Sequence, residues 1–121
     1  MKRIVTVMCL IALAGCYNDK EDQLYPKGAT GGCDTTNVTF AATIQPILTQ
    51  YCATANCHDA SFQGGGYNMT SYQGAMLAAP RMIGALTWQS GYSAMPKGMN
   101  KLGDCEISKI TKWVNMGAPN N

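Results

Sequence analysis

Three residues that could do chemistry stand close together near the middle of the chain: Cys52, Cys57 and His58, the only histidine among the 121 residues. Two thiols and an adjacent imidazole can hold a c-type haem, because the thiols add across its two vinyl groups while the imidazole binds the iron. The same groups are also ligands for copper or zinc. The two thiols could instead form a disulfide, with the histidine playing no part. Residue types alone leave these three interpretations open.

The haem interpretation has a specific spacing to satisfy. The common form is C-x-x-C-H, whereas this chain has C-x-x-x-x-C-H, with residues 53–56 between the two cysteines. We expect the two additional small or polar residues to bulge outward while both sulfurs still reach the porphyrin edge. The histidine directly after the second cysteine is kept.

The start of the chain predicts export and lipidation. Two basic residues precede an apolar run over residues 4–14, which is too short to span a bilayer and is typical of a secretory signal. The LAGC sequence that ends at Cys16 resembles the lipobox of bacterial lipoproteins, in which the cysteine is acylated and becomes the new first residue. We therefore expect a lipoprotein signal peptide over residues 1–15 and a lipid on Cys16.

Composition divides the remainder of the chain into a tether and a domain and gives the charge of the mature protein. Residues 16–32 are polar and contain glycine and proline, as expected of a flexible tether, and 33–121 form the expected domain. Loss of the signal removes two of nine basic residues and leaves seven against seven acidic ones. This balance gives no support for a nucleic-acid partner. We expect an exported protein, attached by its lipid at the periplasmic side or on the outer membrane, where surface exposure is one option.

The cysteines fall into groups by position. Cys9 lies in the signal and Cys16 is the lipid site, so four remain in the domain: Cys33, Cys52, Cys57 and Cys105. Four cysteines allow three disulfide pairings, or one disulfide beside a two-cysteine site. Because Cys33 and Cys105 lie at the two ends of the domain, we predict that they pair. The bond would close a loop of about 70 residues and stabilise the domain by around 4 kcal/mol.

Helical periodicity appears on both sides of the cysteine pair. Apolar residues recur at helical spacing immediately before Cys52, at Phe40, Ile44, Ile47, Leu48 and Tyr51. A second apolar pattern, at Ile107, Ile110, Trp113 and Val114, predicts a last helix with Asp104 as N-cap and Gly117 at its end. Between them, Thr70 or Ser71 is expected to cap a short helix through Leu77.

Two stretches of this chain resemble a known family. FAATIQPILTQYCATANCH resembles the first helix and haem-binding turn of small class I cytochromes c, single-haem c-type cytochrome domains. SAMPKGMNKLGDCEISKITKWVNMGAPNN resembles their methionine-bearing loop and closing helix. The resemblance covers residues 38–121. It implies a membrane-tethered electron-transfer protein, not an enzyme, that exchanges electrons with redox partner proteins of a respiratory chain.

The resemblance also implies a fold and a cofactor. The fold would be all-α, a small helical domain around one covalent haem c, with the first and last helices crossing and packing. Phe40 or Ile44 should then contact Trp113.

In the resembled family the sixth iron position is filled by a methionine in a loop before the last helix, commonly followed by proline. Met95, followed by Pro96, matches that place, and Met99 is the second candidate. A thioether is a soft, weak ligand that raises the haem potential and suits electron transfer. The chain has eight methionines, however, and most methionines fill cores.

Two residues between the helices are candidates for contacts with a haem propionate. Arg81 and Trp88 are both side chains that can donate hydrogen bonds, which a buried carboxylate needs. Equally, Arg81 could be a surface charge and Trp88 a core residue.

Two other functions compete with electron transfer. One is a copper- or zinc-binding lipoprotein that uses Cys52, Cys57, His58 and a methionine, since cysteine and methionine suit copper(I). The other is a structural lipoprotein in which Cys52 and Cys57 form a disulfide.

Overall fold

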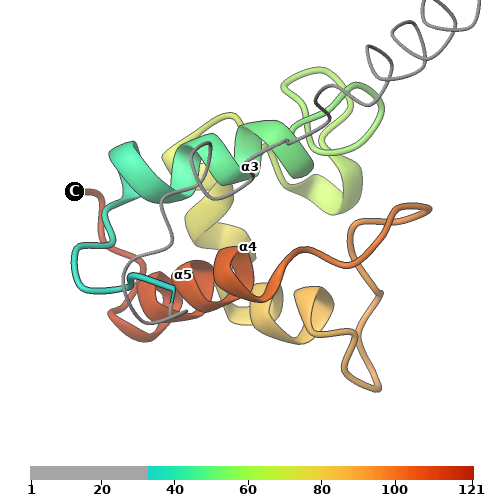
Figure 1. The fold of residues 1–121 in the computed structure, drawn as a ribbon. Coiled ribbons are helices and arrows are strands. Elements are labelled where there is room, and N and C mark those ends of the chain that lie inside the picture. Colours follow the sequence, from blue (N-terminus) through green and yellow to red (C-terminus); the bar gives the residue numbers. More distant parts are fainter. Residues whose placement is uncertain (1–32) are drawn as a thin grey trace, which may run out of the picture. The chain divides into compact units, whose positions relative to one another are not determined.

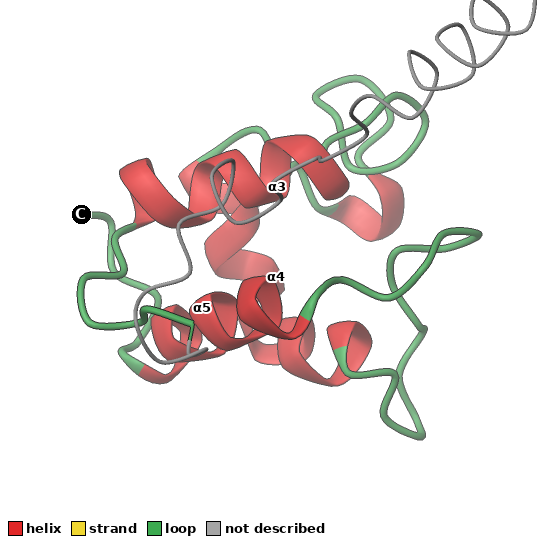
Figure 2. Ribbon diagram, viewed as in Figure 1, coloured by secondary structure: helices red, strands yellow, loops and turns green. Residues whose placement is uncertain are grey.

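A computed structural model describes residues 33–121, and this part of the chain is built from helices and loops (Figures 1 and 2). Its elements are η1 (Phe40–Ile44, a π-helical turn), α3 (Gln45–Tyr51), η2 (Gly64–Gly66, a 3-10 turn), α4 (Tyr72–Leu86) and α5 (Asp104–Asn115). No strand occurs within these 33–121 residues. The all-α prediction is confirmed for the described part, whereas the predicted signal peptide, the tether and the lipid site at Cys16 lie outside it.

The first helical run, η1 followed by α3, leads into the cysteine pair. Thr39 caps it, because its hydroxyl accepts the Ala42 N–H at 3.3 Å. Pro46 stands in the first turn of α3, where its missing N–H and fixed φ are tolerated. The run buries an apolar stripe formed by Phe40, Ile44 and Leu48.

Helix α4 begins as expected and ends later. Ser71 is its N-cap and accepts the Gly74 N–H at 3.3 Å. The helix does not stop near Leu77 but continues through Pro80 to Leu86. Pro80 cannot donate to the preceding turn, yet the buried face continues past it, with Ala75, Ala78, Ala79, Met82 and Leu86 in the core. Burial of that face favours the longer helix.

Helix α5 closes the domain against η1. Gly103, not Asp104 as predicted, is the N-cap, so Asp104 lies in the first turn, where its charge complements the helix dipole. The Phe40 ring centroid lies 5.6 Å from that of Trp113 and 5.1 Å from that of Tyr72. The predicted packing of Phe40 on Trp113 is therefore confirmed.

Two long-range connections fasten the ends of the described part. Cys33 and Cys105 form the predicted disulfide, with their Cα atoms 5.2 Å apart. At the C-terminus, Asn121 accepts the Phe40 N–H with its Oδ1 at 2.8 Å and the Ala41 N–H with its backbone oxygen at 3.0 Å. None of the helices in residues 33–121 has the length and hydropathy to cross a membrane.

Figure 1 shows the positions of the two long connections relative to the C-terminus. The C-terminus lies beside the start of the first helical run, whereas the connection after α3 and the connection between α4 and α5 extend at the other end of the molecule. The candidate site lies between these two connections.

Candidate functional site

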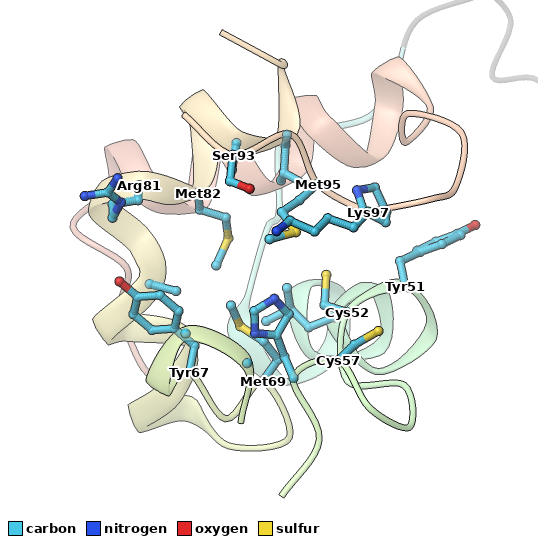
Figure 3. Close-up of a pocket in the computed structure, with 18 of the residues that line it drawn as sticks. Tyr51, Cys52, Cys57, Tyr67, Met69, Arg81, Met82, Ser93, Met95 and Lys97 are labelled. Atoms are coloured by element: carbon cyan, nitrogen blue, oxygen red, sulfur yellow. The ribbon is translucent and has the colours of Figure 1, made fainter. Parts of the chain in front are cut away.

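A cavity of about 500 Å³ is lined by both connections and by the inner face of α4 (Figure 3). Its volume falls in the range of pockets that enclose a small organic ligand or cofactor. The lining includes the predicted cysteines and histidine together with both methionine candidates: Cys52, Cys57, His58, Met95 and Met99. The fold thus brings together residues from two segments about 40 positions apart.

The turn that carries the cysteines folds back on the end of α3. Cys52 is the C-cap of that helix, and its carbonyl accepts the His58 N–H at 3.1 Å. Asn56 adopts a left-handed φ of 63°, which asparagine tolerates better than most residues, and both Ala55 and Asn56 are exposed. Ala55 is exposed and does not line the cavity, as an outward bulge predicts, whereas the exposed Asn56 lines it together with Cys52, Cys57 and His58.

His58 is held by its backbone, and no hydrogen bond to its ring is found within residues 33–121. Its carbonyl accepts the Met69 N–H at 2.8 Å. Nδ1 is the one buried side-chain nitrogen or oxygen in residues 33–121 that has no hydrogen-bond partner. Such an atom in a folded protein calls for a functional explanation. Nδ1 of His58 is therefore not engaged by any other group in the described part of the chain.

Gly64 packs closely against the backbone of Cys57 and near the ring of His58. Its N–H donates to the Cys57 carbonyl at 2.7 Å. A Cβ at Gly64 would lie 2.7 Å from that carbonyl oxygen and 3.6 Å from Cε1 of His58. Only glycine allows this close approach of the loop to the cysteine turn.

Met95 faces the cysteine turn from the opposite wall. Figure 3 shows Met95 on one side of the cavity and Cys52 and Cys57 on the other. Met95 is partly buried and packs on the core, whereas Met99 is 52% exposed. Of the two candidates, Met95 is the one whose side chain the fold holds against the cavity.

The backbone of Met95 is fastened at both of its polar groups. Its N–H donates to the Ala85 carbonyl, in the last turn of α4, at 3.0 Å. Its carbonyl accepts the indole N–H of Trp88 at 2.9 Å. The structure therefore gives Trp88 a role other than the predicted propionate contact: it does not line the cavity and its single donor is engaged by Met95.

Positive charge surrounds an otherwise largely apolar cavity. Arg81, the other predicted propionate contact, lines it, with its guanidinium carbon 5.7 Å from the Tyr92 ring centroid. Lys97 lines it as well (Figure 3), and among the described residues no aspartate or glutamate does. These cations suit a ligand with an apolar body and anionic groups.

The comparisons give no further guidance. No protein family, curated protein or solved structure matches this chain. What the site can do is therefore decided by its own residues.

Burial affects the two thiols differently. Burial, and to a lesser extent the nearby Cys57 thiol, raise the pKa of Cys52 to about 11. Cys52 is consequently a neutral thiol at pH 7, whereas Cys57 is exposed at the cavity mouth. Both are free cysteines in the structure, which does not support the structural lipoprotein with a Cys52–Cys57 disulfide.

The donor atoms are spread around the cavity and do not meet at one point. Within residues 33–121, no three histidine, cysteine, aspartate or glutamate side chains lie close enough together to hold a single metal ion. A four-coordinate copper or zinc site would need its ligands to converge. A c-type haem needs the sulfurs at the porphyrin edge and only an axial pair at the iron.

The sequence alone did not point to several lining residues. Lys97 was missed although it is two positions after Met95, and Tyr67, whose ring centroid is 6.4 Å from that of His58, was missed after the glycine run. Met69 and Met82 are buried and also line the cavity. Its position close to Met95 was the only feature of the sequence that could have indicated Lys97 as a lining residue. No feature of the sequence indicated Tyr67.

Proposed function

We propose that residues 33–121 are a single-haem c-type cytochrome domain that carries electrons. One observation carries the proposal: Cys52, Cys57 and His58, from one turn, line the same cavity of about 500 Å³ as Met95, from the facing loop. Cys52 and Cys57 would hold haem c through thioether bonds, and His58 and Met95 would be the axial iron ligands. The bound haem supplies the one-electron redox chemistry.

The residues around the cavity have defined tasks under this proposal. His58 and Met95 would together supply both protein ligands of the iron, a pair that suits electron transfer. The apolar wall from α4, including Ala78, Met82 and Leu86, excludes water. Arg81 and Lys97 are placed at the lining, where they can pair with propionates. No general acid or base is required, so we propose an electron carrier and not an enzyme.

The cellular setting follows from the sequence and from one feature of the fold. We propose an exported lipoprotein, anchored through lipid on Cys16, that exchanges electrons with redox partner proteins of a respiratory chain and binds no nucleic acid. The Cys33–Cys105 disulfide supports this setting, because such bonds persist in oxidising compartments outside the cytoplasm.

Covalent haem attachment tests the proposal directly. The protein should be made in a strain that matures c-type cytochromes, then denatured and extracted with acid acetone. We expect the pigment to stay with the polypeptide and the mass to increase by one haem. A Cys52→Ala/Cys57→Ala protein should be colourless under the same treatment. Colourless wild-type protein would refute the proposal.

A copper- or zinc-binding lipoprotein is the second candidate. It is favoured by the number of soft sulfur donors at the cavity, since four methionines line it beside Cys52 and Cys57: Met69, Met82, Met95 and Met99. Elemental analysis of the purified protein distinguishes the two. One copper or zinc per chain, with no covalent haem, would establish this candidate.

A further inference from the structure

We propose that Trp88 is a positioning residue for the sixth iron ligand: its indole N–H clamps the carbonyl of Met95 and so holds the thioether over the cavity. The inference rests on the proposed function, because it concerns Met95 as an axial ligand. It assigns to Trp88 a role that its sequence context does not indicate.

The clamp is needed because Met95 lies in a long irregular connection. No helix or strand occurs between Leu86 and Asp104, so the loop has no ladder of backbone hydrogen bonds to keep it in place. The thioether is itself a weak ligand. The Met95 backbone must therefore be held by other contacts.

Those contacts come from the end of α4 and from Trp88. The Met95 N–H is bound by the Ala85 carbonyl at 3.0 Å, and the Met95 carbonyl is bound by Trp88 Nε1 at 2.9 Å. Both polar groups of one residue are thus tied to a segment that a rigid helix supports. Because both hydrogen bonds fix the Met95 backbone, its side chain has little freedom to leave the cavity.

Trp88 does not behave as a core residue. Its side chain is 47% exposed, it does not line the cavity, and it adopts a left-handed φ of 58°, which is unusual for a bulky residue. A residue held in an unfavourable conformation with half its ring in water contributes little by burial. Within residues 33–121 the one hydrogen bond of its side chain goes to the Met95 carbonyl, which indicates that the side chain acts through Met95.

Trp113 offers a matched control. Its indole N–H also donates to a backbone carbonyl, that of Pro119, at 2.9 Å, but it is fully buried in the core and not at the cavity. Trp88→Phe and Trp113→Phe therefore remove the same kind of hydrogen bond from two different places.

The test uses the haem-loaded protein and measures how readily an added ligand displaces Met95. We expect Trp88→Phe to raise the affinity of the ferric protein for imidazole about 3- to 10-fold, as expected for one lost hydrogen bond, and to weaken the near-infrared iron–sulfur charge-transfer band. Trp113→Phe should lower the unfolding midpoint more and leave the imidazole affinity unchanged. Unchanged imidazole affinity in Trp88→Phe, or an equal rise in both variants, would overturn the inference.

Hydrogen exchange at the Met95 amide gives an independent readout. We expect this amide to exchange faster in Trp88→Phe than in the wild-type protein, with the amides in the middle of α5 unchanged. Equal exchange at Met95 would also overturn the inference. Failure of the proposed function gives a different result, a wild-type protein that carries no covalent haem, and the exchange measurement still tests the clamp in that protein.

Discussion

Met95 and Met99 stand only four residues apart, but they differ in burial and in how their backbones are held. Met95 is partly buried and fastened by two backbone hydrogen bonds, whereas Met99 is half exposed at the same cavity. We expect Met95→Ala to abolish the iron–sulfur charge-transfer band and to lower the redox potential, because a thioether ligand raises it. Met99→Ala should keep both properties. Persistence of the band in Met95→Ala would move the assignment to Met99.

Gly64 should be essential for the shape of the cysteine turn. We expect Gly64→Ala to reduce the yield of haem-loaded protein strongly, because the new Cβ would stand 2.7 Å from the Cys57 carbonyl oxygen. Gly66→Ala is the control: Gly66 has a φ of 83° but nothing within 4 Å of its Cβ position. It should cost about 1–2 kcal/mol from the left-handed conformation and leave the absorption spectrum intact. Equal loading of both variants would contradict this role for Gly64.

The two cysteines should differ in reactivity in the haem-free protein. The raised pKa of Cys52, about 11 instead of 9.0, means that its thiolate forms only as the pH approaches 11. At pH 8 that thiolate is about 100-fold scarcer than for an ordinary thiol, since each pKa unit is a factor of ten. We expect iodoacetamide to modify Cys57 at pH 8 and Cys52 only at high pH, as read by peptide mass mapping.

A Cys57→Ala protein isolates the slower thiol in this experiment. Rapid labelling of Cys52 at pH 8 in that variant would show that the site is more open than its burial indicates. In the haem-loaded protein neither cysteine should react, because both sulfurs would be thioethers.

At the scale of elements, an aromatic cluster joins the first helical run, α4 and α5. Phe40 packs against both Tyr72 and Trp113, and the Tyr72 hydroxyl donates to the Ala118 carbonyl at 2.9 Å. None of the residues in these contacts lines the cavity. The cluster should therefore control stability and not ligation.

Tyr72→Phe tests this division between stability and ligation. We expect a loss of about 1 kcal/mol in the free energy of unfolding, from one hydrogen bond, and no change in the haem spectrum. Urea denaturation followed by circular dichroism measures the loss. Tyr92→Phe is the control, because no hydrogen bond from the Tyr92 hydroxyl is found in the described part of the chain. A spectral change in Tyr72→Phe would show that the two ends of the domain are coupled.

At the scale of the whole described domain, the Cys33–Cys105 disulfide closes a loop across a sequence separation of 72 residues. It ties the segment before η1 to the first turn of α5. A bond that closes so long a loop restricts the unfolded chain strongly.

We expect removal of this bond in Cys33→Ala/Cys105→Ala to lower the free energy of unfolding by about 4 kcal/mol. Denaturant titrations with and without reductant measure the effect, and reductant should destabilise the wild-type protein but not the double variant. Non-reducing peptide mapping that finds both residues as free thiols would contradict the structure at this point.

The sequence determined those features that depend on neighbours close along the chain. The turn from Cys52 to His58 closes within seven residues, so the closeness of the two cysteines and the histidine followed from spacing. The helical stripes before Cys52 and in α5 followed from periodicity, because burial on one side of a helix repeats every three or four residues. The pairing of Cys33 with Cys105 is an exception, because the two lie 72 residues apart and the prediction rested on their places at the ends of the domain.

Tertiary structure alone decided what happens across the cavity. It paired the Trp88 indole N–H with the Met95 carbonyl, placed Lys97 at the lining of the cavity and carried α4 past Pro80 to Leu86. These outcomes depend on which surfaces become buried together once segments about 40 residues apart meet. Spacing along the chain carries no information on such contacts, since their free energy arises only when the helices have packed.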